Sequence, residues 1–189
     1  MCHNYALKRV ICEDVALGEV RNYMETNSTT SVPAATSVHR EISIFRLDAD
    51  HDVDVLEALA DQAEKNGWVA PTFRAALIAR ERIFPTGLPT QIPVAIPHAD
   101  TVHVLKSGLG VAVLARPVQF GEMGGAASSV DARVAVMILV QDPREQILLL
   151  TQLIGLFQTP DWFDRLEEAT DLDGLVAIFG HLLTAEAGS

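Results

Sequence analysis

The sequence predicts an α/β fold: a three-layer α/β/α sandwich around a mixed sheet of about five strands. Two apolar runs, residues 109–115 and 132–140, show no alternation of apolar and polar side chains. Such runs are typical of strands that helices cover on both faces. Segments with helical periodicity flank them, and about five strands is a common sheet size for this arrangement.

Length and composition predict one folded domain. The chain has 189 residues, of which 49% are hydrophobic and 6% aromatic, so we expect a core of aliphatic layers. Residues 21–40 are rich in Ser, Thr, Asn and Ala with little periodicity, which is typical of a linker. We therefore assign residues 1–40 to a poorly ordered tail and 41–185 to the domain. The tail could be a regulatory extension, the remnant of another domain or the product of a misplaced start codon.

The domain is expected to open with a strand at residues 42–46, ISIFR, followed by a helix. Asp50 or Asp52 can cap this helix, and Asn66-Gly67 is a common way for a helix to end. Its apolar positions recur with helical spacing: Val53, Leu56, Leu59, Ala60 and Ala63.

A second amphipathic helix is expected from Phe73 onward, with Pro71 near its first turn. Phe73, Leu77, Arg80 and Phe84 fall at i, i+4, i+7 and i+11, which places Arg80 on the apolar stripe. A charge is costly there unless it is paired or meets an anion. An arginine that extends its head to solvent, or pairs with the adjacent glutamate, explains the pattern equally well.

The next segment turns the chain and delivers a histidine to the end of a short strand. Pro85-Thr86-Gly87 predicts a turn that presents a hydroxyl group, and the strand that begins at Val94 ends at Pro97, which lacks an N–H. The ring of His98 should then project at the sheet edge, open to solvent, although a histidine can also simply end a strand.

Together these residues supply the parts of a phosphoryl-accepting site. The imidazole of His98 is a nucleophile, while Arg80 and Thr86 can donate to the charge on phosphoryl oxygens. They occupy one predicted helix-turn-strand unit, so their convergence is possible.

The C-terminal part is predicted to be helical. Asp142, Pro143 and Glu145 supply a cap, a first-turn proline and a capping-box partner for a helix through Phe157. Thr159-Pro160 and Thr170-Asp171 begin two more helices in the same manner.

These motifs resemble the enzyme IIA domains of the bacterial sugar phosphotransferase system (PTS), in the fructose/mannitol superfamily and its galactitol-type branch. The resemblance runs from about Ile42 to Leu183. It rests on five segments: RE at Arg80-Glu81, PTGL at residues 85–88, VAIPH ending at His98, RPVQF at residues 116–120, and VAVMILVQDPREQILLL at residues 134–150.

The resemblance implies a three-layer fold and a phosphohistidine carrier. His98 would take a phosphoryl group from HPr and pass it to a cysteine of a sugar-specific IIB component, which serves a membrane IIC component. No nucleotide, metal or other cofactor is implied. A regulatory module of the nitrogen-PTS type, whose phosphorylation state controls a binding partner, is the alternative.

One position departs from many mannitol- and fructose-type members, which carry a second histidine where this chain has Gln146. A glutamine amide can donate a hydrogen bond to a phosphoryl oxygen but cannot carry charge or a proton. The resemblance to the galactitol-type branch is strengthened by this glutamine, although an ordinary polar residue in the first turns of a helix is equally plausible.

Other classes of function have little support. A formal net charge of −11 argues against nucleic acid and favours a basic partner. The longest uninterrupted apolar run, residues 134–140, is far shorter than the ~20 residues of a membrane helix, and Cys2 and Cys12 precede the domain, so we expect a cytoplasmic protein with free thiols. His98 and His103 are spaced so that they point to different sides of a helix or strand, which disfavours a metal site.

Overall fold

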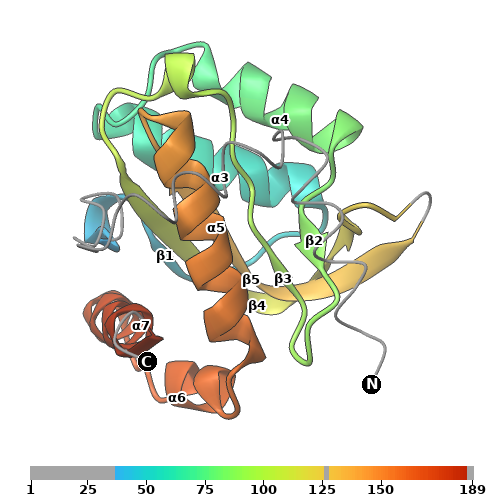
Figure 1. Ribbon diagram of the computed structural model, residues 1–189, viewed down its shortest axis with the longest axis vertical. Helices are drawn as coiled ribbons and strands as arrows, with labels where there is room; N and C mark the ends of the chain where they lie inside the picture. The colour runs from blue at the N-terminus through green and yellow to red at the C-terminus, as the bar shows by residue number, and fades with distance from the viewer. Residues whose placement is uncertain (1–36, 126–127, 187–189) are drawn as a thin grey trace, which may run out of the picture. The chain divides into compact units, whose positions relative to one another are not determined.

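The computed structural model describes residues 37–125 and 128–186, all of which belong to one unit that spans Ala34–Ser189. Its sheet contains five strands in the order β1-β4-β5-β3-β2 (Figure 1). The strands are β1 (Ile44–Leu47), β2 (Gly87–Leu88), β3 (Val94–Ala95), β4 (Gly108–Gly121) and β5 (Ser129–Leu139). The predicted disorder of the tail up to residue 36, and the two cysteines, lie outside the described residues.

The sheet is mixed, as predicted. β1 pairs with β4 and β3 with β5 in parallel, whereas β4 pairs with β5 and β2 with β3 in antiparallel fashion. β4 and β5 form the central hairpin. Val111 and Ala112, which are neighbours and therefore point to opposite faces, are both fully buried. Burial on both faces explains why these strands lack an alternating pattern.

The helices lie on both sides of the sheet. They are α3 (Asp52–Lys65), α4 (Phe73–Ile83), α5 (Pro143–Gln158), α6 (Trp162–Glu167) and α7 (Leu172–Glu186), with 3-10 turns η2 (Arg40–Ile42) and η3 (Thr101–His103). α3 packs against α4, and their buried residues share one core with one face of the sheet. α5 crosses the opposite face and packs against α7 (Figure 1). This is the predicted α/β/α sandwich.

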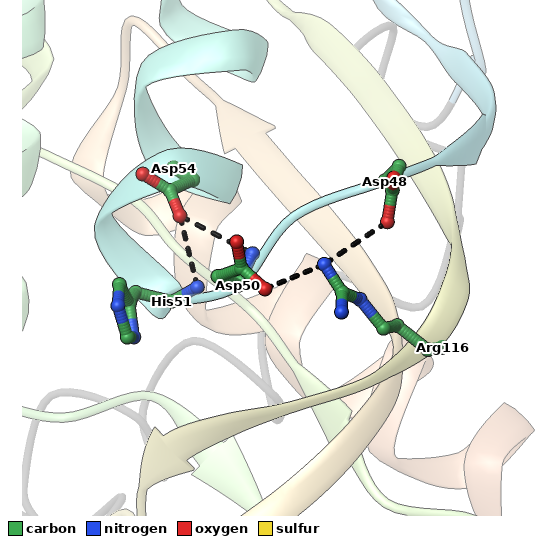
Figure 2. A network of polar contacts seen from close by, with 5 residues as sticks. All are labelled: Asp48, Asp50, His51, Asp54 and Arg116. Atoms are coloured by element: carbon green, nitrogen blue, oxygen red, sulfur yellow. Dashed lines mark hydrogen bonds and ion pairs between the residues drawn. The ribbon is translucent and has the colours of Figure 1, made fainter.

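A network of polar contacts ties the start of α3 to β4 (Figure 2). His51, not Asp50 or Asp52, is the N-cap residue, and the Asp54 carboxylate accepts the backbone N–H of His51 at 2.9 Å. Arg116 donates to Asp50 at 2.6 Å and lies 3.2 Å from Asp48. The RPVQF segment therefore belongs to β4, and its arginine anchors the loop that leads into α3.

α4 buries a polar residue that the sequence pattern does not predict, in addition to the buried Nε of Arg80. Phe73 and Leu77 are buried, as expected, but the next position at a spacing of four is Glu81, which is only 5% exposed. The helix ends at Ile83, and Phe84 is 54% exposed instead of continuing the apolar stripe.

Residues 37–40, which composition assigns to the tail, make contacts with the rest of the domain. Leu109 of β4 donates its N–H to the Ser37 carbonyl and accepts the N–H of His39, both at 2.9 Å. The His39 ring also packs on Trp68, with ring centroids 4.3 Å apart. Residues 37–40 therefore extend the sheet edge and contact the α3/α4 layer.

Candidate functional site

His98 lies directly beyond β3, where the chain still runs beside β5. Ile138 of β5 donates its N–H to the Pro97 carbonyl at 3.0 Å, so His98 pairs with Ile138 in an isolated parallel bridge. The residue is only 5% exposed. The ring is thus more enclosed than the solvent-open position that the sequence predicts, because the C-terminal part of α4 lies against it.

Two hydrogen bonds indicate which nitrogen of the His98 ring carries the proton. An Nη2 of Arg80 lies 2.7 Å from Nε2, and Nδ1 lies 2.9 Å from the backbone carbonyl oxygen of Ile96. A guanidinium group has only donors and a carbonyl oxygen only accepts. Nε2 therefore carries the lone pair and Nδ1 carries the proton, which makes Nε2 the nucleophilic atom of the ring.

Arg80 reaches the ring from α4 with donor capacity to spare. Its Nε is buried and has no hydrogen-bond partner among the described residues. Its guanidinium carbon also lies 5.4 Å from the centre of the Phe84 ring, which is a cation–π contact. A planar group with an unused donor beside a nucleophilic nitrogen matches the geometry of phosphoryl oxygens.

Thr86 belongs to the same cluster, but its side chain is engaged elsewhere. Its hydroxyl donates to Oε2 of Glu81 and its backbone N–H donates to Oε1, both at 2.8 Å. The residue is 1% exposed. Its carbonyl accepts the N–H of Ile96 at 3.2 Å. Thr86 therefore connects α4 to the segment that carries His98.

Glu81 is the site residue that sequence reasoning missed. Burial raises the pKa of its carboxyl group to about 7, against the opposing effect of the two hydrogen bonds from Thr86. The nearby Asp52 carboxylate also raises this pKa, and Arg80 lowers it. The spacing of four residues from Phe73 to Leu77 to Glu81 was the available signal, because it marks position 81 as part of the buried face.

Gln146 lies near the start of α5, whose N-terminus is capped by Asp142. The Asp142 carboxylate accepts the N–H of Arg144 at 2.9 Å. α5 follows β5 and so begins at the same end of the sheet as His98. Gln146 is half-buried at this end of the sheet.

The remaining candidate features lie apart from this cluster. Nδ1 of His103 pairs with the Thr72 hydroxyl at 2.8 Å, at the opposite end of α4 from Arg80. Across residues 37–125 and 128–186, no three His, Cys, Asp or Glu side chains gather where they could hold a metal ion. In the same ranges, no helix has the length and apolarity that a membrane crossing requires.

Comparison with known proteins assigns the fold and the family. Residues 38–181 match the family model for the phosphoenolpyruvate-dependent sugar phosphotransferase system, EIIA 2. The PTS system galactitol-specific EIIA component of Escherichia coli K12 is 34% identical over 116 residues, which are 60% of this chain and 75% of that protein.

Two solved structures share the architecture. One is the complex of enzyme IIAMTL and phosphorylated enzyme IIBMTL from Escherichia coli, with a TM-score of 0.63, 23% identity and coverage of 77% of this chain and 99% of that chain. The other is the nitrogen regulatory protein IIA-Ntr from Neisseria meningitidis, with a TM-score of 0.60, 19% identity and coverage of 75% and 95%. At these identities the structures show the fold, while the family match covers most of the sequence. The chain therefore belongs to the EIIA 2 family of the phosphoenolpyruvate-dependent sugar phosphotransferase system.

Proposed function

We propose that this protein accepts a phosphoryl group from phospho-HPr on Nε2 of His98 and passes it to a cysteine of a cognate IIB component. The observation that carries the proposal is the pair of contacts on the ring. The Ile96 carbonyl oxygen accepts Nδ1–H of His98 at 2.9 Å, and the Arg80 guanidinium lies 2.7 Å from Nε2. The nucleophile and the group that compensates phosphoryl charge are thus already adjacent.

In the first transfer, the Nε2 lone pair attacks phosphorus, the N–P bond to the HPr histidine breaks, and that bond's electron pair returns to the HPr ring. Arg80 leaves the lone pair and donates to the phosphoryl oxygens, where the charge of the transition state is spread. The phosphorylated ring keeps its proton on Nδ1, and the Ile96 carbonyl oxygen compensates the positive charge of the imidazolium.

In the second transfer, a cysteine thiolate of IIB attacks phosphorus, the bond to Nε2 breaks, and its electron pair becomes the Nε2 lone pair again. Ile83 and Phe84 are 69% and 54% exposed at the end of α4 beside Arg80. Exposed apolar side chains next to the reacting atoms are suited to contact with partner proteins.

We further propose that the cognate system is galactitol-like. The support is the 34% identity to the galactitol-specific EIIA component of Escherichia coli, together with Gln146 where a second histidine stands in many mannitol- and fructose-type members. The sugar itself is bound by the membrane component, so this assignment concerns the IIB partner that the protein recognises.

Radioactive label from phosphoenolpyruvate, supplied through enzyme I and HPr, tests the proposal. Wild type should become labelled and should lose the label to a galactitol-type IIB. His98→Ala should remain folded and accept no label, because the ring provides the only proposed bond to phosphorus.

His103→Ala is the matched control, because His103 is a half-buried histidine that pairs with Thr72, away from Arg80. It should behave like wild type. Labelling of His98→Ala at the wild-type level would refute the assignment. Acceptance without transfer to any IIB would favour a regulatory module whose phosphorylation state is read by another protein.

A further inference from the structure

The candidate nucleophile belongs to a closed cycle of hydrogen bonds. Glu81 accepts two hydrogen bonds from Thr86, and the Thr86 carbonyl accepts the N–H of Ile96. The Ile96 carbonyl in turn accepts Nδ1–H of His98, and Nε2 of His98 accepts from Arg80. Arg80 and Glu81 are consecutive residues of α4, so their peptide bond closes the cycle.

Glu81 is the one member of this cycle whose charge can change without the loss of a hydrogen bond that links the members. As a carboxylate it accepts both the N–H and the hydroxyl of Thr86 at 2.8 Å. As a carboxylic acid it still accepts the N–H, and its own O–H can donate to the Thr86 hydroxyl oxygen, which has free lone pairs. The frame is therefore compatible with either protonation state.

The groups that face Glu81 make its proton sensitive to the state of His98. Burial, the two Thr86 hydrogen bonds, Asp52 at the start of α3 and Arg80 on α4 set its pKa at about 7. A phosphoryl group on Nε2 adds negative charge nearby and engages the positive charge of Arg80. Both effects favour the neutral form of Glu81.

We infer that Glu81 is a proton-linked positioning residue: it holds the segment that carries His98 through Thr86, and its average protonation rises, with uptake from solvent, when His98 becomes phosphorylated. The proton returns to solvent when the phosphoryl group leaves. This inference rests on the proposed function, which names the phosphoryl group, whereas the positioning role concerns the unphosphorylated protein as well.

The sign of the pH dependence follows from linkage. Well below pH 7 Glu81 is protonated in both forms, so the pH has little effect through this residue. As the pH rises through 7, the unphosphorylated form ionises first, and phosphoryl acceptance becomes less favourable until Glu81 ionises in both forms. Glu81→Gln lacks this step, since its amide is always neutral and can make both contacts to Thr86.

The positioning role is tested on the full chain without any partner protein. Two-bond 15N–1H spectra report which ring nitrogen of His98 carries the proton, with His98→Gln identifying the signal. Wild type and Glu81→Gln should show the Nδ1–H tautomer. Glu81→Met, which fills similar space but cannot bind Thr86, should show a mixture with Nε2–H. An unchanged Nδ1–H tautomer in folded Glu81→Met would overturn the positioning role.

The proton linkage is tested by the equilibrium of phosphoryl exchange with phospho-HPr from pH 6 to pH 9. The exchange equilibrium constant of Glu81→Gln, divided by that of wild type, should rise about tenfold over this range, which corresponds to a pKa shift of about one unit. Glu57→Gln, an exposed glutamate of α3, is the control and should give a constant ratio. A constant ratio for Glu81→Gln as well would overturn the linkage. Absence of label in wild type would refute the proposed function instead, and would leave the tautomer measurement valid.

Discussion

Arg80 contacts the ring nitrogen of His98 that attacks phosphorus in the proposed transfer. At 2.7 Å from Nε2 the guanidinium keeps the ring in one tautomer, and the proposal requires it to move before phosphorus can approach. Its buried Nε, which has no hydrogen-bond partner among the described residues, shows that this position does not satisfy the whole group. The resting contact therefore keeps the arginine close to the place where the proposed function requires its charge.

Replacement of Arg80 by Leu should slow phosphoryl acceptance by about a hundredfold, by analogy with the loss of one oxyanion donor, while stability stays equal or rises. Label transfer from phospho-HPr and urea unfolding are the measurements. Arg82→Leu, which removes an exposed arginine of the same helix, should leave the transfer rate unchanged. A large loss of stability in Arg80→Leu would show that Arg80 is a structural cation.

Sequence pattern alone identified His98 and Arg80 as candidate site residues, which lie in contact in the structure, but it missed the burial of Glu81. The spacing from Phe73 to Arg80 and Phe84 assumed that the helix continues, whereas α4 ends at Ile83. Glu81 then takes the buried position, and Thr86 turns its hydroxyl toward it. Whether a charged residue in the last turn of a helix is buried depends on where the helix stops, and that boundary is set by packing rather than by local sequence.

At the scale of elements, the segment Ser37–His39 acts as part of the sheet edge. It contributes two backbone hydrogen bonds to Leu109 and a ring contact with Trp68. Space beside it is tight, because a Cβ on Gly108 would lie 2.6 Å from the His39 ring. Composition could not reveal this, since Ser37-Val38-His39 continues a polar, aperiodic stretch and gains its structure only from β4.

Two truncations separate the tail from the domain. We propose that a fragment that begins at Ser37 melts like the full chain and accepts phosphoryl groups at the same rate. A fragment that begins at Glu41 should melt about 4–8 °C lower, because the lost backbone hydrogen bonds and ring contact stabilise by about 2 kcal/mol. Its phosphoryl acceptance should persist, since Arg80 and His98 remain. Thermal unfolding and label transfer are the readouts.

A Ser37 fragment that melts far below the full chain would instead assign residues 1–36 to the working domain. A Ser37 fragment that melts like the full chain but transfers phosphoryl groups to IIB more slowly would indicate that the tail contacts a partner. These outcomes distinguish a structural extension from a regulatory one.

The lengths of the strands were the least predictable feature of the fold. β4 extends from Gly108 to Gly121 although Pro117 interrupts the pattern, because a register shift between Val113 and Val118 accommodates the proline. β2 is only Gly87–Leu88, a length at which a turn and a strand cannot be told apart by sequence. Central strands without alternation were predictable, since burial on both faces leaves a direct trace in composition.

At the scale of the whole molecule, the α/β/α arrangement brings separate parts of the chain to one end of the sheet. β3 delivers His98, α4 delivers Arg80 and Glu81, and α5 begins after β5, the strand next to β3. The full chain carries a formal net charge of −11. A net negative charge favours rapid association with a basic partner more than it increases affinity.

The most direct test of this account is to identify the phosphorylated atom. Wild-type protein labelled with 15N histidine and phosphorylated by phospho-HPr should show one phosphohistidine, with phosphorus on Nε2 of His98 and the proton still on Nδ1. This result follows from the Ile96 carbonyl, which holds Nδ1–H at 2.9 Å and leaves Nε2 as the nucleophile. Phosphorus on Nδ1, or on any residue other than His98, would contradict the account.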